Sequence, residues 1–232
     1  MQYEEYTYAE SRDTFRTFLT KTFTTMTLGL IVSALVAFVI AYMFPSLSLN
    51  FFVFLFVALA QIGVTIYFSS RLFSMSANSA RLCFVIYSVL TGVTFSTLFL
   101  VYDLGSIAMA FTMTAVVFAC MSIIGHTTKM DLTKFTPYFI AGLFAILIST
   151  LLNSLFFHSY AMNNIINYLA IIVFLGLVAY DMQTLRHLYA SGIDDPEMRD
   201  KLSIYGAFQL YLDFINLFVR ILQIFGRSNS DN

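Results

Sequence analysis

Charge is scarce in this sequence. Asp, Glu, Lys and Arg together make up 11% of the 232 residues, whereas soluble domains carry about 25%. Hydrophobic residues reach 59% and the mean hydropathy is +0.81. This composition excludes an ordinary soluble domain and predicts an integral membrane protein surrounded by the lipid bilayer. The net charge of −1 also argues against nucleic acid as a partner.

Proline and cysteine are scarce as well. Three prolines and no low-complexity run leave no recognisable linker, so we expect one domain. The two cysteines, Cys83 and Cys120, lie in apolar stretches and have no C-x-x-C spacing. We expect them to be buried thiols rather than metal ligands or a disulfide, and we predict no cofactor.

The first residues are unlike a cleavable signal. Residues 1–21 are polar and of mixed charge, and the apolar run after them is longer than the hydrophobic core of a signal peptide. We expect residues 1–21 to be a cytoplasmic segment, either a short interfacial helix or a solvated tail with a few apolar anchors. Residues 227–232 are interpreted as a C-terminal tail.

Long apolar runs fill the rest of the chain. Between Thr22 and Ser70 there is no Asp, Glu, Lys or Arg, and Pro45 and Asn50 bracket a turn that divides this region in two. The whole pattern predicts an all-α membrane protein with seven spans, at about 22–44, 51–69, 82–101, 105–124, 136–157, 164–184 and 204–225. Each span is long enough to cross ~30 Å of hydrocarbon.

The basic residues support this topology. With the N-terminus in the cytoplasm, all of the twelve Lys and Arg except Arg220 and Arg227 fall in cytoplasmic segments, as the positive-inside rule requires. The two exceptions lie at the end of the seventh span. A re-entrant last segment would return Arg227 to the cytoplasm, but this segment has spanning length, so we expect seven full spans.

The last apolar stretch, from Ser203 to Gly226, carries a polar stripe. Its five members are spaced four, three, four and three residues apart: Gln209, Asp213, Asn216, Arg220 and Gln223. On a helix they fall within about one quarter of the circumference. A charged stripe inside a bilayer must face protein, water or an ion rather than lipid. We therefore expect this helix to lie inside a bundle, with Asp213 at the working site.

Asp181 is the second acid in the membrane zone. It closes the sixth span near the cytoplasmic boundary, and Asp213 lies about ten residues into the helix that returns from the same side. If the two carboxyl groups meet in a poorly solvated site, both cannot ionise easily, so the pair would share a proton. Such a pair suits pH sensing, and its oxygens suit a transient contact with Ca²⁺.

Plainer roles stay open for each charged residue. Asp181 could be only an interfacial residue or a loop cap. Asp213 could be a neutral, hydrogen-bonded core acid or could pair with Arg220 one heptad away, and we expect Arg220 itself to snorkel. Arg71 and Arg81, at the cytoplasmic rim, suit topology anchors, although either could hold Asp181 in an ion pair.

Three motifs together resemble one protein family. They are HTTKMDLTKF at 126–135, VFLGLVAYDMQTL at 173–185 and GAFQLYLDFINLFVRILQIFG at 206–226. They resemble the Bax inhibitor-1, or transmembrane Bax inhibitor motif, family, and in particular its bacterial YccA/YbhL-like members. The likeness covers essentially the whole chain from about residue 15.

The resemblance implies a seven-helix bundle with the last helix at its centre, in the bacterial inner membrane, and a pH-sensitive calcium leak. It implies that Asp181 and Asp213 form the pH-sensing pair and that Arg71 is the latch for Asp181. Some relatives carry an acid inside the second helix, where this chain has Gln61. The bacterial members further imply modulation of a membrane-bound quality-control protease.

Three functions fit these patterns. The first is a passive, proton-gated calcium pathway, in which carboxylate repulsion would open the path and an Arg71 latch would close it. The second is a membrane adaptor that modulates a quality-control protease or a stress response without transport. The third is an intramembrane aspartyl protease, although the G-x-G-D sequence of that class is absent around Asp213. We expect the first, a channel rather than an enzyme.

Overall fold

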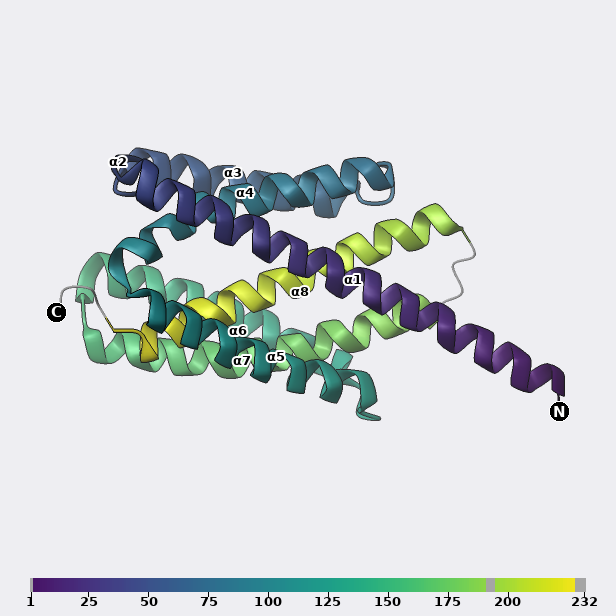
Figure 1. Cartoon of the computed structure of the whole chain (residues 1–232). Coiled ribbons are helices and arrows are strands. Elements are labelled where there is room, and N and C mark those ends of the chain that lie inside the picture. The colour runs from purple at the N-terminus through teal and green to yellow at the C-terminus, as the bar shows by residue number, and fades with distance from the viewer. Residues whose placement is uncertain (1, 191–194, 228–232) are drawn as a thin grey trace. The chain divides into compact units, whose positions relative to one another are not determined.

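The protein is all-helical. The computed structural model describes the backbone of residues 2–190 and 195–227, and side chains from residue 15 onward. Every regular element in these ranges is a helix, with no β-strand among them (Figure 1). Seven helices are long and apolar enough to cross a membrane. The predicted fold class, an all-α membrane protein with seven spans, is therefore confirmed.

The long helices follow the predicted order. They are α1 (Gln2–Met43), α3 (Phe51–Arg71), α4 (Ala77–Val101), α5 (Leu104–Thr127), α6 (Thr136–Leu152), α7 (Tyr160–Ala190) and α8 (Pro196–Phe225). A single turn, α2 (Pro45–Ser48), lies in the predicted bend after α1. The 3₁₀ turn η1 (Leu132–Phe135) precedes α6, and the π-turn η2 (Asn153–Phe157) extends it.

Several helices begin where a side chain caps the backbone. Oδ1 of Asn50 accepts the N–H of Phe52 at 2.9 Å at the start of α3. Asp103 accepts the N–H of Ser106 at 2.9 Å at the start of α5. Asp195 accepts two N–H groups of the first turn of α8, at 3.1 and 3.3 Å. These bonds satisfy donors that a helix leaves unpaired, and the last one starts α8 before the apolar stretch at 204.

The N-terminal segment differs from the expectation. Residues 2–21 were predicted as a separate segment, but they are continuous with α1, which runs unbroken from Gln2 to Met43. No proline and no glycine precedes Gly29, so nothing in the sequence ends the helix at the membrane boundary. The predicted tail from residue 228 onward lies outside the described residues.

The helices group into two compact units rather than one. The first unit comprises residues 1–100 and 188–211, and thus α1 to α4 with the first half of α8. The second unit comprises residues 101–187 and 212–232, and thus α5 to α7 with the second half of α8. No proline- or glycine-rich linker marks this division, because α8 itself continues from one unit into the other.

The last helix is the most buried span. Of its most apolar window, 72% is buried, against 11–39% for the other six. Leu210, Tyr211, Leu217 and Leu222 are fully buried. This is the burial that the resemblance implied for a central last helix.

One contact in each unit fixes an end of α8. In the first unit, Lys201 donates to the carbonyl of Phe73 in the turn between α3 and α4. In the second unit, the N–H of Arg227 donates to Ser106 Oγ at 2.9 Å, just after the junction of α4 and α5. α8 runs unbroken over 30 residues and is long and apolar enough to cross a membrane. The full seventh span stays a prediction.

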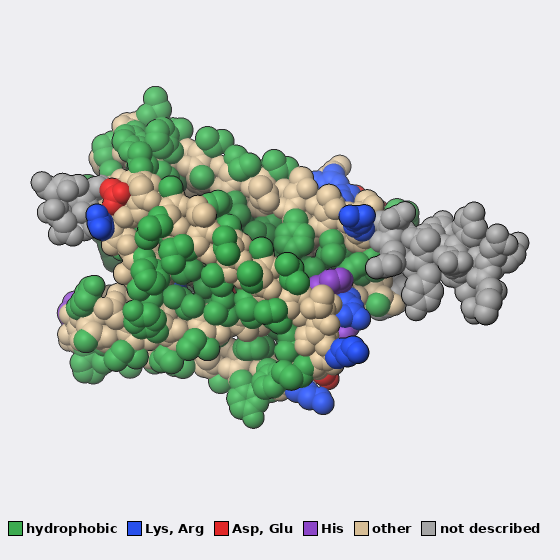
Figure 2. All heavy atoms as spheres, turned by 60° about the horizontal axis from the view of Figure 1, so that its bottom comes forward, with side chains coloured by type: hydrophobic (Ala, Val, Ile, Leu, Met, Phe, Trp, Pro, Cys, Tyr) green, Lys and Arg blue, Asp and Glu red, His purple; other side chains and the backbone are tan. Residues whose placement is uncertain are grey.

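The other helices present apolar side chains outward. Figure 2 shows hydrophobic side chains over most of one face, with Lys, Arg, Asp and Glu gathered towards its ends. Phe52 of α3 is 79% exposed, which is the pattern of a lipid-facing surface. The cysteines correct one expectation: Cys83 is half-buried and Cys120 is exposed, so the apolar setting of Cys120 is the outer surface of α5.

Two glycines offer a matched test of helix packing. A Cβ on Gly125 of α5 would lie 2.2 Å from the carbonyl oxygen of Ala179 on α7, whereas a Cβ on Gly63 of α3 meets nothing within 4 Å. Both substitutions by Ala gain similar helix propensity, about 1 kcal/mol. We expect Gly125→Ala to lower the melting temperature in detergent, because overpacking costs about 1–3 kcal/mol, and Gly63→Ala to keep or raise it. Equal shifts would contradict the close approach of α5 and α7.

Candidate functional site

The two predicted acids meet in the second unit. Asp181 of α7 is half-buried, Asp213 of α8 is 5% exposed, and their carboxyl groups lie within hydrogen-bonding reach of each other. Oδ2 of Asp213 is buried without a hydrogen-bond donor. Two ionised carboxylates offer only acceptors, so a hydrogen bond between them requires that one carries a proton. A proton shared between the two acids stays a prediction.

A side chain that sequence reasoning missed fixes the α7 end of this pair. Gln183 is buried, its Nε2 donates to the carbonyl of Met130 at 2.8 Å, and its Oε1 accepts the N–H of Leu132 at 2.8 Å. Arg186 also donates to the carbonyl of His126 at 2.9 Å. The residues around Asp181 are thus tied to the turn that follows α5. Its signal in the sequence was a Gln two residues after Asp181, at the polar end of the sixth span.

Aromatic packing fixes the α8 end of the pair. Phe214, the residue after Asp213, packs against Phe111 and Phe118 of α5, with ring centroids 5.2 and 5.5 Å apart. Such contacts stabilise by about 0.5–1.5 kcal/mol beyond the area they bury. They hold this turn of α8 against α5, so that the position of Asp213 does not depend on its own hydrogen bonds.

The remaining residues of the polar stripe are only partly buried. Gln209, Asn216, Arg220 and Gln223 all keep some accessible surface, while the apolar positions between them are mostly buried. Nδ2 of Asn216 donates to the carbonyl of Leu212 at 2.8 Å on its own helix. Four members of the polar stripe are therefore partly accessible, while the fifth, Asp213, is buried. A face towards water or an ion stays a prediction.

Arg220 differs from both of its predicted roles. Its Nη1 donates to Oδ1 of Asn167 on α7 at 2.9 Å, and Asn167 is fully buried. The guanidinium group therefore points to a neighbouring helix instead of snorkelling to the membrane edge. In the described part of the chain it makes no ion pair with Asp213.

Arg71 ends α3 as an exposed residue of the first unit. Its carbonyl accepts the N–H groups of Ser74 and Met75, at 3.0 and 2.9 Å, and so closes the turn into α4. Asp181 belongs to the second unit. A latch between Arg71 and Asp181 stays a prediction.

A second polar set fixes the first half of α8 in the first unit. The hydroxyl of Tyr211, a fully buried residue, lies 2.6 Å from Oγ of Ser33 on α1. The same Oγ donates to the carbonyl of Ser88 on α4 at 2.8 Å. Gln61 of α3 donates to Thr91 of α4 at 3.1 Å. These bonds link α1, α3, α4 and α8 through neutral groups.

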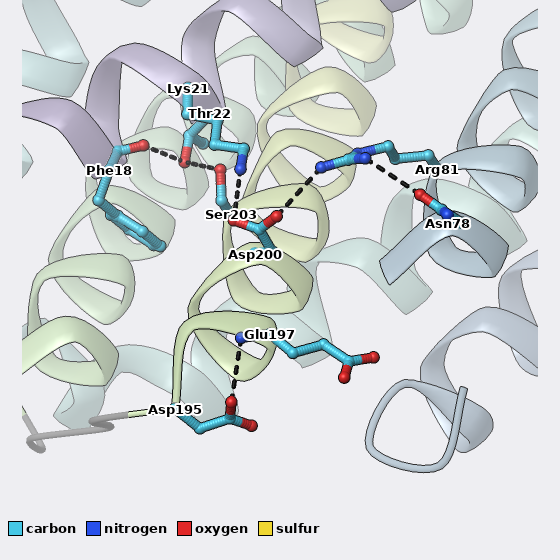
Figure 3. Close-up of polar contacts among 9 residues, drawn as sticks. All are labelled: Phe18, Lys21, Thr22, Asn78, Arg81, Asp195, Glu197, Asp200 and Ser203. Carbon is cyan, nitrogen blue, oxygen red and sulfur yellow. Dashed lines mark hydrogen bonds and ion pairs between the residues drawn. The ribbon is translucent and has the colours of Figure 1, made fainter. Parts of the chain in front are cut away.

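A charged cluster at the start of α8 was not foreseen. Asp200 accepts from Lys21 of α1 and from Arg81 of α4, the latter at 3.1 Å (Figure 3). Beside it, Oγ1 of Thr22 and Oγ of Ser203 lie 3.1 Å apart in a buried contact. Arg81 therefore pairs with Asp200 within the first unit rather than serving only as a topology anchor. The sequence pointed to this cluster only through opposite charges on three segments, all predicted to lie at the same membrane boundary.

Metal ligands are not gathered elsewhere. The described residues contain no group of three or more His, Cys, Asp or Glu arranged to hold a metal ion. The predicted contact of Ca²⁺ with Asp181 and Asp213 stays a prediction.

Fold and site together define a helical membrane protein with a carboxyl pair between two of its spans. The model of the family described as inhibitor of apoptosis-promoting Bax1 matches residues 15–230. The chain belongs to the Bax inhibitor-1 family, which confirms the resemblance seen in its motifs.

The relatives match over nearly their whole length. The inner membrane protein YbhL of Escherichia coli K12 is 39% identical over 222 residues, 94% of this chain and 94% of YbhL. An uncharacterized protein of Borreliella burgdorferi is 39% identical over 220 residues, 92% of this chain and 93% of that protein. An uncharacterized protein of Deinococcus radiodurans is 36% identical over 230 residues, which cover 97% of this chain and 96% of that protein.

The charged cluster around Asp200 makes a testable contribution to stability. Its side chains are 35–46% exposed, so each pair stabilises by about 0–1 kcal/mol and is screened by salt. We expect Asp200→Asn to lower the melting temperature at low salt and to remove most of its salt dependence. Asp195→Asn removes the same charge but keeps a capping side chain, and should leave that dependence intact. A salt response unchanged in Asp200→Asn would contradict the cluster.

Proposed function

We propose that this protein is a pH-responsive pathway for calcium ions across the inner membrane, with Asp181 and Asp213 as its sensing pair. The observation that carries the proposal is the contact of two carboxyl groups on adjacent spans, one of them with a buried oxygen that lacks a donor. Family membership and the accessible polar stripe of α8 support it. Hard cations prefer carboxylate oxygens, and the pathway requires no catalytic step.

Electrostatic repulsion between the two carboxyl groups would control gating. With one proton the two acids can share a hydrogen bond, whereas full ionisation places two like charges side by side in a poorly solvated site. Repulsion would then favour separation of α7 and α8 at this level. The bonds of Gln183 and the packing of Phe214 resist that separation. The fully ionised pair would therefore strain the packing of α7 and α8, whereas the pair with one proton would not.

The orientation follows from charge and from a relative. YbhL is an inner membrane protein by name, and the excess of Lys and Arg in alternate loops supports an N-terminus in the cytoplasm. In this orientation Asp181 lies near the cytoplasmic end of α7, and protons of the cytoplasm reach the pair over a short distance.

Calcium flux into liposomes that contain the purified protein tests the proposal. Wild-type flux should depend on pH. Asp213→Asn and Asp181→Asn each mimic a permanently protonated acid, so each should give flux that is independent of pH and equal to the wild-type value at acidic pH. The substitutions are isosteric and remove buried charge, and a circular-dichroism melt checks that each variant folds.

Asp131→Asn is the matched control. The hydroxyl and N–H of Thr133 hold the pKa of Asp131 below its usual range, so this exposed loop acid stays ionised over the tested pH range, and Asn keeps its capping role. The variant should retain the wild-type pH profile. If the protein passes no calcium at any pH, or if the pair substitutions leave the profile unchanged, the leak is wrong and a membrane adaptor without transport becomes the better account.

A further inference from the structure

Arg220 is a positive charge in the same helical stripe as the carboxyl pair. It lies seven residues after Asp213, which is about 10 Å along the helix axis. Its only hydrogen bond in the described part of the chain goes to Oδ1 of Asn167, a neutral and fully buried side chain. Arg220 itself is half-buried, as are Asn216 and Gln223 of the same stripe.

No acid compensates this charge among the described residues of the second unit. Each acid there has another role: Asp103 caps α5 through Ser106, Asp131 binds Thr133, and Asp181 and Asp213 face each other. Nδ2 of Asn167 adds a further buried donor without a partner. The region around Arg220 is therefore rich in donors and positive in potential, at a depth where an unpaired charge is costly.

The fixed position of the guanidinium group decides what this charge can do. A snorkelling Arg would leave the polar stripe and be screened at the membrane surface. The bond to Asn167 instead keeps Arg220 at one level of α8, where a half-buried charge acts on a passing ion with less screening than at the membrane surface.

We propose that Arg220, positioned by Asn167, is an electrostatic barrier to cations that limits the leak and discriminates against divalent ions. This inference rests on the proposed pathway along the polar stripe. The energy of an ion beside a fixed charge is proportional to the charge of the ion, and flux depends exponentially on that energy. Removing the charge of Arg220 should therefore multiply divalent flux by the square of the factor for monovalent flux.

The test compares Ca²⁺ and K⁺ flux into liposomes for the wild type and Arg220→Gln. We expect Arg220→Gln to raise Ca²⁺ flux about tenfold and K⁺ flux about threefold, the square root of that factor. Arg220→Lys keeps the charge and should stay within about twofold of wild type for both ions. Asn167→Asp keeps Arg220 but places a carboxylate beside it, and should reproduce the increase seen in Arg220→Gln.

The pH profile separates this inference from the proposed function. Arg220→Gln should keep the pH response of the wild type, because Asp181 and Asp213 are intact. If the wild-type leak depends on pH but Arg220→Gln does not increase the flux, or increases it equally for both ions, the barrier is wrong and the proposed leak is kept. If the wild type passes no ions and Arg220→Gln does, the barrier is supported. Silence in the wild type, Arg220→Gln and Asn167→Asp alike overturns both proposals.

Discussion

An acid within a membrane span must find a proton or a partner, and in this protein two acids find each other. Asp213 is buried close to Asp181, and its Oδ2 has no hydrogen-bond donor. Hydrocarbon offers no water to supply one. Contacts of Gln183, Gly125 and Phe214 hold α5, α7 and α8 together around this pair.

The last helix carries this constraint through the protein. Its first half is fixed in the first unit by neutral hydrogen bonds at Tyr211 and by the charged cluster around Asp200. Its second half is fixed in the second unit by Phe214 and by the bond of Arg220 to Asn167. The helix is unbroken over these contacts, so one element carries both sets of fixing residues.

Hydropathy alone was sufficient for the number and order of the spans, because a bilayer leaves long apolar runs as its signature. It was less informative at the ends of α1, α7 and α8, where polar turns continue the helix beyond the membrane and carry no hydropathy signal.

The sequence predicted the residues of the site but not their hydrogen-bond partners on other helices. Helical spacing placed Asp213, Asn216 and Arg220 on one face, and the chain direction suggested that Asp181 could reach Asp213. Which helices are neighbours is a property of packing, so the bonds from Arg220 to Asn167 and from Gln183 to the turn after α5 had no counterpart in the sequence.

The most direct test of the account is to observe the shared proton itself. Infrared difference spectroscopy of the protein in lipid reports the carbonyl stretch of a protonated carboxylic acid as pH is varied. The account predicts one such band that titrates as a single-proton step in the wild type and is lost when both Asp181 and Asp213 are changed to Asn. A wild type in which the two acids titrate independently, or in which the double substitution removes no band, would contradict a proton shared between them.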